Sequence, residues 1–301
     1  MKSCILIQCF VKELETINVL KSLELCEGIH EYSLVLYIDK AIRNSKFENA
    51  NNELINKLLS YKNENISKYL EITIIVADKN LGPYICCGKG IDFCFSKYDY
   101  VIFSEDDALF MKDSIKFYNS YRDNIIPNPE DCISISAFSP FFITNNKDLE
   151  YVKTKYCNQI DLIKNDVLKD NLFNKTCKIN LISNKQFGIF KNKWEKIRHF
   201  RTSYHMNLKL PYAPDRQTTN YVIENKLFSY FSIIPRTNDI GLFHELGCTT
   251  LYYKKDHELR TIKFLTSDDF FIEEKKDIEI LDNVSFQHCS KYKNLDNYID
   301  L

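Results

Sequence analysis

The chain has 301 residues, of which 45% are hydrophobic and 27% are charged, and its formal net charge is −1. A chain of this length can bury one large α/β core. The near-neutral charge excludes the strongly basic surface typical of nucleic-acid-binding proteins, so we expect no nucleic-acid partner. The 11 cysteines show no regular spacing, which favours reduced thiols over a disulfide framework.

No apolar run in the sequence reaches the roughly 18 residues that a membrane-spanning helix needs. The first strand is predicted to begin almost at Met1, with no signal peptide before it. We therefore expect a cytoplasmic protein whose contact with a membrane is at most peripheral, at the inner face.

The first part of the chain alternates between short apolar runs and amphipathic segments. The apolar runs predict strands at residues 4–10, 32–38, 71–77 and 100–103. The amphipathic segments predict helices at residues 13–26, 51–70 and 84–96. This alternation is typical of an α/β fold with a mostly parallel sheet and helices on both faces.

The second part of the chain is less regular. Further helices are predicted at residues 112–122, 191–199 and 215–226, and further strands at 132–138 and 228–234. Residues 140–180 are polar, rich in Asn and Lys, and without clear periodicity. They are predicted to form an insertion or a loop.

Three consecutive acidic residues, Glu105, Asp106 and Asp107, follow the predicted strand at 100–103. Carboxylates that are held together repel each other, and a hard divalent cation relieves that repulsion. Ligands of open α/β sheets bind beyond the carboxyl ends of the strands. The pattern therefore predicts a Mg²⁺ or Mn²⁺ site, and the alternative is a solvated acidic turn.

Polar residues also follow the neighbouring predicted strands. Asp39 ends the second strand, and the turn at Asp78–Gly82 ends the third. Together with the acidic residues after the fourth strand, they would lie along one rim of the sheet, as in a nucleotide crevice. The sequence contains no glycine-rich phosphate loop, so a metal and side chains would have to neutralise the phosphates.

Five segments resemble, in the same order, motifs of glycosyltransferases of the GT-A fold, most closely N-acetylglucosaminyltransferase I and its bacterial relatives. They are the strand that ends in Glu105–Asp107, Ile135–Phe138, Phe187–Phe190, Pro214–Arg216 and Arg236–His244. Pro214 and Phe190 stand where the family has tryptophan. Both departures lie on the acceptor side, so the resemblance does not identify the acceptor.

The resemblance implies a metal-dependent, inverting glycosyltransferase with Mn²⁺ or Mg²⁺ as its cofactor. The donor would be a nucleotide-diphosphate sugar, with UDP expected, and the acceptor a saccharide or a glycolipid. It also implies a single GT-A domain with a nucleotide-sugar-binding half at residues 1–125 and an acceptor-binding half at 126–250. Residues 251–301 would be a C-terminal extension of unknown role.

Individual residues are candidates for these roles, some through the resemblance and others through their place in the chain. Candidate donor-binding residues are Gln8, Asp39, Lys89, Glu105 and Asp106. Candidate metal ligands are Asp107 and His244. Asp215 is the candidate general base, because an inverting transfer needs one carboxylate near the acceptor hydroxyl.

Each role has a plainer structural alternative. Glu105 would stabilise a helix N-terminus, Asp39 would shape a turn, and Asp215 would cap a helix. Lys89 would be a solvated lysine, His244 a structural histidine, and Trp194, a possible sugar-stacking residue, a core residue. Asp239 is an alternative base.

Two other functions stay open from the sequence. A sugar nucleotidyltransferase would use a similar crevice and metal, but it normally has a basic, glycine-rich loop after the first strand, which residues 8–14 do not supply. A non-catalytic protein that binds a sugar nucleotide or a glycan would keep the crevice without the chemistry.

Overall fold

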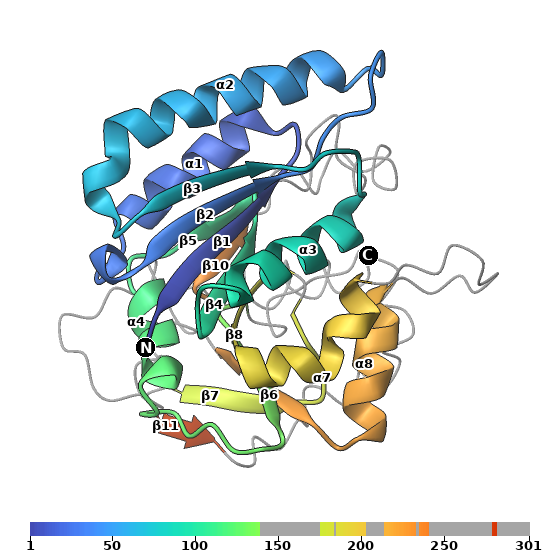
Figure 1. Ribbon diagram of the computed structural model, residues 1–301. Coiled ribbons are helices and arrows are strands. Elements are labelled where there is room, and N and C mark those ends of the chain that lie inside the picture. Colours follow the sequence, from blue (N-terminus) through green and yellow to red (C-terminus); the bar gives the residue numbers. More distant parts are fainter. Residues whose placement is uncertain (139–174, 184, 203–213, 233–234, 241–278, 282–301) are drawn as a thin grey trace, which may run out of the picture.

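The computed structural model describes residues 1–138, 175–183, 185–202, 214–232, 235–240 and 279–281. Figure 1 shows a central sheet with helices packed on both of its faces. The predicted α/β fold with a mostly parallel sheet is confirmed.

Within the described ranges, the central sheet has nine strands in the order β11-β7-β9-β6-β8-β4-β1-β2-β3. In chain order they are β1 (Ser3–Cys9), β2 (Ser33–Ile38), β3 (Ile72–Val76), β4 (Tyr100–Glu105), β6 (Cys132–Ser136), β7 (Lys175–Ile179), β8 (Gln186–Phe190), β9 (Phe228–Ser232) and β11 (Glu279–Leu281). A separate antiparallel pair consists of β5 (Ala108–Phe110) and β10 (Thr237–Asp239). The helices are α1 (Glu13–Glu24), α2 (Glu48–Asn65), α3 (Pro83–Phe95), α4 (Ser114–Arg122), α7 (Lys191–Thr202) and α8 (Pro214–Glu224).

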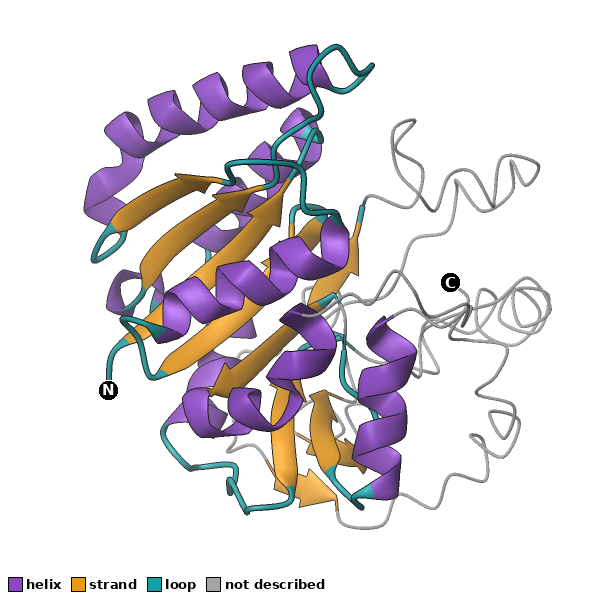
Figure 2. Cartoon of the chain, turned by 45° about the vertical axis from the view of Figure 1, so that its right-hand side comes forward, coloured by secondary structure: helices purple, strands orange, loops and turns teal. Residues whose placement is uncertain are grey.

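Strand β1 is apolar along its whole length because both of its faces are covered. Ile5 and Ile7 pack into one hydrophobic cluster with residues of α1 and α2, and Cys4 and Leu6 pack into a second with residues of α3 and α7. Successive side chains of a strand point to opposite faces, so an unbroken apolar run serves both clusters. Figure 2 shows α3 and α7 together on the second face.

Strand β4 lies in the middle of the sheet. It pairs with β1 in parallel on one side and with β8 antiparallel on the other. The parallel neighbours β1, β2 and β3 come from the first part of the chain, whereas β8 brings in the second part. The carboxyl end of β4 therefore lies between the segment that leaves β1 and the segment that enters β8.

Five short strands, β5, β7, β8, β10 and β11, are absent from the sequence prediction. The polar run 140–180 ends in a strand, β7, which pairs antiparallel with β9. Strand β11 lies within 251–301 and pairs with β7 at the edge of the sheet. Strand β5 follows β4 directly and pairs with the distant β10. These short strands have little local signal, because pairing with a neighbour decides them.

The two parts of the chain are tied together by Asp92 on α3. Its carboxylate accepts hydrogen bonds from Trp194 Nε1 at 2.9 Å and from Arg198 Nε and Nη2 at 2.7 and 2.9 Å. Trp194 is 2% exposed, which confirms the prediction that it packs in the core and leaves no face for a sugar. The central sheet also crosses the predicted boundary near residue 125, although the division of roles between the two halves stays a prediction.

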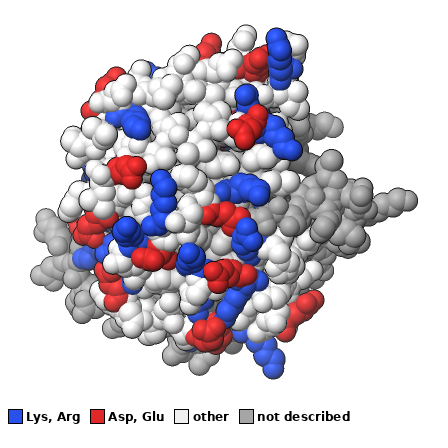
Figure 3. Space-filling view, in the orientation of Figure 1, with Lys and Arg blue, Asp and Glu red and all other residues white. Residues whose placement is uncertain are grey.

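Positive and negative side chains are interspersed on the face drawn in Figure 3. This mixture accords with the near-neutral net charge of the chain. Of the helices in the described part of the chain, none combines the length and apolar character that a membrane span requires.

Gly188 on β8 leaves room for the ring of Tyr100 on β4. A Cβ atom at position 188 would lie 2.0 Å from Tyr100 Oη and 2.9 Å from Tyr118 Cδ1. Both tyrosines are fully buried, so neither ring can move into solvent. We expect Gly188→Ala to lower the free energy of unfolding by about 1–3 kcal/mol through overpacking, measured by urea denaturation.

The Tyr100→Phe background tests this cause, because it removes the hydroxyl that the new methyl group would meet first. The loss caused by Gly188→Ala should be smaller in that background. An equal loss in both backgrounds would contradict the overpacking explanation.

Candidate metal and donor-binding site

The acidic residues lie at the end of β4, which is where the sequence predicts a ligand. Glu105 is the last residue of β4, and Asp106 and Asp107 form the turn into β5. No helix begins at this turn, so the interpretation of Glu105 as a helix N-terminal residue is wrong. We refer to Glu105, Asp106 and Asp107 as the acidic triplet.

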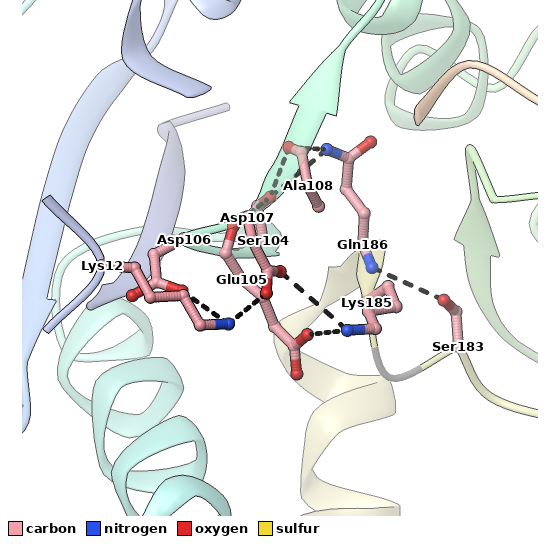
Figure 4. A network of polar contacts seen from close by, with 9 residues as sticks. All are labelled: Lys12, Ser104, Glu105, Asp106, Asp107, Ala108, Ser183, Lys185 and Gln186. Carbon is pink, nitrogen blue, oxygen red and sulfur yellow. Dashed lines mark hydrogen bonds and ion pairs between the residues drawn. The ribbon is translucent and has the colours of Figure 1, made fainter. Parts of the chain in front are cut away.

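Lysines approach the acidic triplet from both sides (Figure 4). Lys12, which follows β1, contacts Asp107 Oδ2 and lies 3.9 Å from Asp106 Oδ1. Lys185, which precedes β8, lies 2.8 Å from Glu105 Oε2 and 3.9 Å from Asp107 Oδ1. Two ammonium groups thus offset part of the charge of the three carboxylates.

The two aspartates differ in their tendency to bind a proton. Burial raises the pKa of Asp106 to about 7, against the opposing charge of Lys12 and the N–H that Phe10 donates to Oδ2 at 3.1 Å. Burial also raises the pKa of Asp107, but Lys185 and Lys12 more than offset it, so its pKa lies below the ordinary value. Asp107 therefore stays ionised more readily than Asp106.

The residues of the acidic triplet fit a hard divalent cation. Asp107 is 2% exposed, and its Oδ1 is buried without a hydrogen-bond partner among the described residues. A buried polar oxygen without a partner costs about 1–3 kcal/mol, and a cation would satisfy it. Within the described ranges no three His, Cys, Asp or Glu side chains are placed so that they could hold a metal ion by themselves. Mg²⁺ commonly binds through one or two carboxylates together with substrate phosphates, so the triplet matches that type of site.

Asp39 shapes the neighbouring loop. Its carboxylate accepts hydrogen bonds from the backbone N–H groups of Leu81 at 2.8 Å and Gly82 at 2.9 Å, and it is 4% exposed. Gly82 has φ +75°, a conformation that favours glycine. Burial raises the pKa of Asp39, and these backbone hydrogen bonds oppose the rise. Asp39 thus stabilises this turn, and its contact with a nucleotide base stays a prediction.

Two further donor candidates lie on the elements around the rim. Gln8 pairs in register with Glu105, and its Nε2 donates to the carbonyl of Pro83 at 2.8 Å. The side chain therefore holds the start of α3 against the end of β1. Lys89 is exposed on α3 and, among the described residues, forms no ion pair with the acidic triplet.

The candidates from the second part of the chain are only partly described. Asp215 is the second residue of α8, so it lies inside the first turn instead of capping it, and its side chain lies outside the described residues. His244 also lies outside them. Asp239, the alternative base, pairs in register with Ala108, and the next residue, Ile240, donates its N–H to the Asp107 carbonyl at 2.8 Å.

Sequence reasoning missed the residues that contact the acidic triplet or the residues on either side of it. Lys12 and Lys185 were not among the candidates, and neither was Gln186, which is fully buried. Gln186 Nε2 donates to Ser104 Oγ at 3.3 Å and to the Ala108 carbonyl at 3.5 Å, on either side of the triplet. The available signal was the rule that buried charges need partners, but it does not say which of the many lysines would supply them.

No protein-family model matches the chain, and no curated protein sequence matches it. Solved structures similar to it include the mannosyltransferase PcManGT from Pyrobaculum calidifontis in complex with GDP-Man and Mn²⁺, with 9% identity and a TM-score of 0.46 over 78% of this chain and 57% of that chain. TarS 1–349 from S. aureus in complex with UDP-GlcNAc has 11% identity and a TM-score of 0.48 over 79% of this chain and 58% of that one. The glycosyltransferase GlyE from Streptococcus pneumoniae has 12% identity and a TM-score of 0.38 over 76% of this chain and 45% of that one. The chain thus spans about half of the length of these proteins.

Proposed function

We propose that this chain is a metal-dependent, inverting glycosyltransferase that uses a nucleotide-diphosphate sugar, with UDP as the expected nucleotide. The acceptor would be a saccharide or a glycolipid. The observation that carries the proposal is Asp107, a deeply buried carboxylate at the carboxyl end of the central strand β4, whose Oδ1 accepts no hydrogen bond from the described residues. The five ordered segments that resemble GT-A glycosyltransferases support it.

In this proposal the rim around the acidic triplet binds the donor. Asp107 would ligate the metal, with His244 as a further ligand, and Glu105 and Asp106 would contact the ribose or metal-bound waters. Asp39, Gln8 and Lys89 would complete the donor contacts. When bound, Mn²⁺ or Mg²⁺ would stabilise the negative charge that develops on the leaving diphosphate.

Asp215 would act as the general base. It would accept the proton of the acceptor hydroxyl while that oxygen attacks the sugar carbon from the face opposite the diphosphate, so that no covalent intermediate is needed. Asp215 lies in the first turn of α8, at the positive end of the helix dipole.

The test is release of nucleoside diphosphate in the presence of Mn²⁺ from UDP-sugars and from GDP-mannose, with and without saccharide acceptors. We expect Asp215→Asn to reduce sugar transfer by about 10²-fold or more, the usual contribution of a general base. Donor binding, measured by calorimetry, should stay unchanged because Asp215 would contact only the acceptor. Glu224→Gln is the matched control, because Glu224 is an exposed carboxylate at the other end of α8.

Other outcomes point to other functions. A protein that binds a sugar nucleotide but releases no diphosphate would be a binding protein. Release of pyrophosphate from a nucleoside triphosphate and a sugar phosphate would indicate a nucleotidyltransferase. Normal transfer by Asp215→Asn would show that another group, such as Asp239, is the base.

A further inference from the structure

Lys12 already neutralises Asp107, the carboxylate that a cation would bind. Its ammonium group contacts Asp107 Oδ2, and its side chain is 18% exposed. A divalent cation bound to the same carboxylate would lie within a few ångströms of this ammonium group, where like charges repel strongly at the low effective dielectric of a buried site. Lys12 and a metal ion therefore compete for Asp107.

The backbone of Lys12 is held in place, whereas its side chain is partly exposed. The Lys12 carbonyl, at the N-terminal end of α1, accepts hydrogen bonds from Thr16 N at 2.9 Å and Thr16 Oγ1 at 2.5 Å. The flexible four-carbon stem of a lysine can carry its ammonium group away from a carboxylate without any movement of the backbone. Once displaced from Asp107, the ammonium group would still lie at the rim where the proposed donor binds.

Lys185 differs from Lys12 in its principal partner. It lies 2.8 Å from Glu105, whose side chain is 35% exposed, but is farther from Asp107 Oδ1, at 3.9 Å. It can therefore keep its contact with Glu105 when a cation binds to Asp107. This makes Lys185 the matched comparison for Lys12.

We propose that the Lys12 ammonium group leaves Asp107 and pairs with the diphosphate of a nucleotide when the nucleotide binds. This inference rests on the proposed function. Without a donor, the Lys12 ammonium group neutralises Asp107 and weakens the binding of a divalent cation. With a donor, it pairs with the diphosphate, and Asp107 is released to the cation. The binding of cation and of nucleoside diphosphate is thereby coupled through one side chain.

The test uses Lys12→Met, which keeps most of the stem and removes the charge. Without nucleotide, the full chain with this substitution should bind Mn²⁺ about tenfold more tightly than the wild type, measured from the electron paramagnetic resonance signal of free Mn²⁺. At saturating Mn²⁺ it should bind UDP and GDP about tenfold more weakly, measured by calorimetry. Both changes lie in the range typical of coupling between two ligands.

Controls separate this exchange from a general change of charge or stability. Lys185→Met should show smaller changes of both affinities, and Lys68→Met, which removes the ion pair with Glu24, should show none. Lys12→Gln removes the charge but keeps a hydrogen-bond donor for Asp107, so it should reproduce the direction of both changes if Lys12→Met does not fold.

The outcomes distinguish the exchange from the proposed function. Unchanged or weaker Mn²⁺ binding by both Lys12 variants would overturn the exchange, and so would unchanged affinity for UDP and GDP. If the wild type binds Mn²⁺ and a nucleotide while the variants behave like it, only the exchange fails. If the wild type binds neither Mn²⁺ nor a nucleotide, the proposed function fails as well.

Discussion

Replacement of Asp107 by asparagine is expected to reduce sugar transfer by about 10³-fold, the upper range for losing one group that stabilises developing charge. The amide keeps the shape of the side chain but loses the negative charge that the cation needs. Steady-state kinetics with a UDP-sugar and Mn²⁺ measure the loss. The affinity for Mn²⁺ in the presence of UDP should fall as well.

This loss must be separated from a loss of structure, because Asp107 is buried between Lys12 and Lys185. Both lysines also face another member of the acidic triplet, so we expect the variant to stay folded, with its far-ultraviolet circular dichroism unchanged. Asp123→Asn, at an aspartate 48% exposed beside Arg122, is the control and should keep full activity. If the folded Asp107→Asn variant transfers sugar at the wild-type rate, Asp107 is not a metal ligand.

Arg236→Met is expected to cause the largest loss of stability, about 3–5 kcal/mol, as removal of one partner of a buried ion pair usually does. Arg236 is 2% exposed, and its Nε donates to Asp113 Oδ2 at 2.8 Å. Its guanidinium group also contacts Ser232 Oγ and lies 4.8 Å from the centroid of the Phe117 ring. Urea denaturation followed by circular dichroism measures the loss.

The backbone of Arg236 explains why this residue also matters for the site. Its N–H donates to the Ala137 carbonyl at 2.8 Å, and its carbonyl accepts from Met111 N at 3.2 Å and Ser114 Oγ at 2.6 Å. These contacts join the segment before β10 to α4 and to the residues that directly follow β6 and β5. Strand β10 in turn pairs with β5, directly after the acidic triplet, so loosening Arg236 should also loosen Asp107.

Arg198→Met provides the comparison for Arg236→Met. Arg198 forms an ion pair with Asp92 through two hydrogen bonds, but its side chain is 54% exposed. Exposed ion pairs contribute about 0–1 kcal/mol, so the same substitution should have a small effect there. Equal losses from the two substitutions would show that burial of the Arg236 pair does not set its contribution.

Local patterns sufficed for the elements that bury much apolar surface. The strands β1, β2, β3 and β4 were predicted within one or two residues, because an apolar run between polar turns is a local property of the sequence. The same reasoning did not find β7, whose sequence Lys175–Ile179 is largely polar. It becomes a strand by pairing with β9, and the local sequence does not encode that pairing.

For the candidate site, the sequence by itself determined which carboxylates stand at the end of β4, because their position after an apolar run is visible in the chain order. Only the tertiary structure decided what surrounds them. Lys12 and Asp107 are 95 positions apart, and Lys185 reaches the triplet because β8 pairs antiparallel with β4. Such partners depend on strand order and register, which arise from the packing of the whole sheet, so no local pattern of residues reveals them.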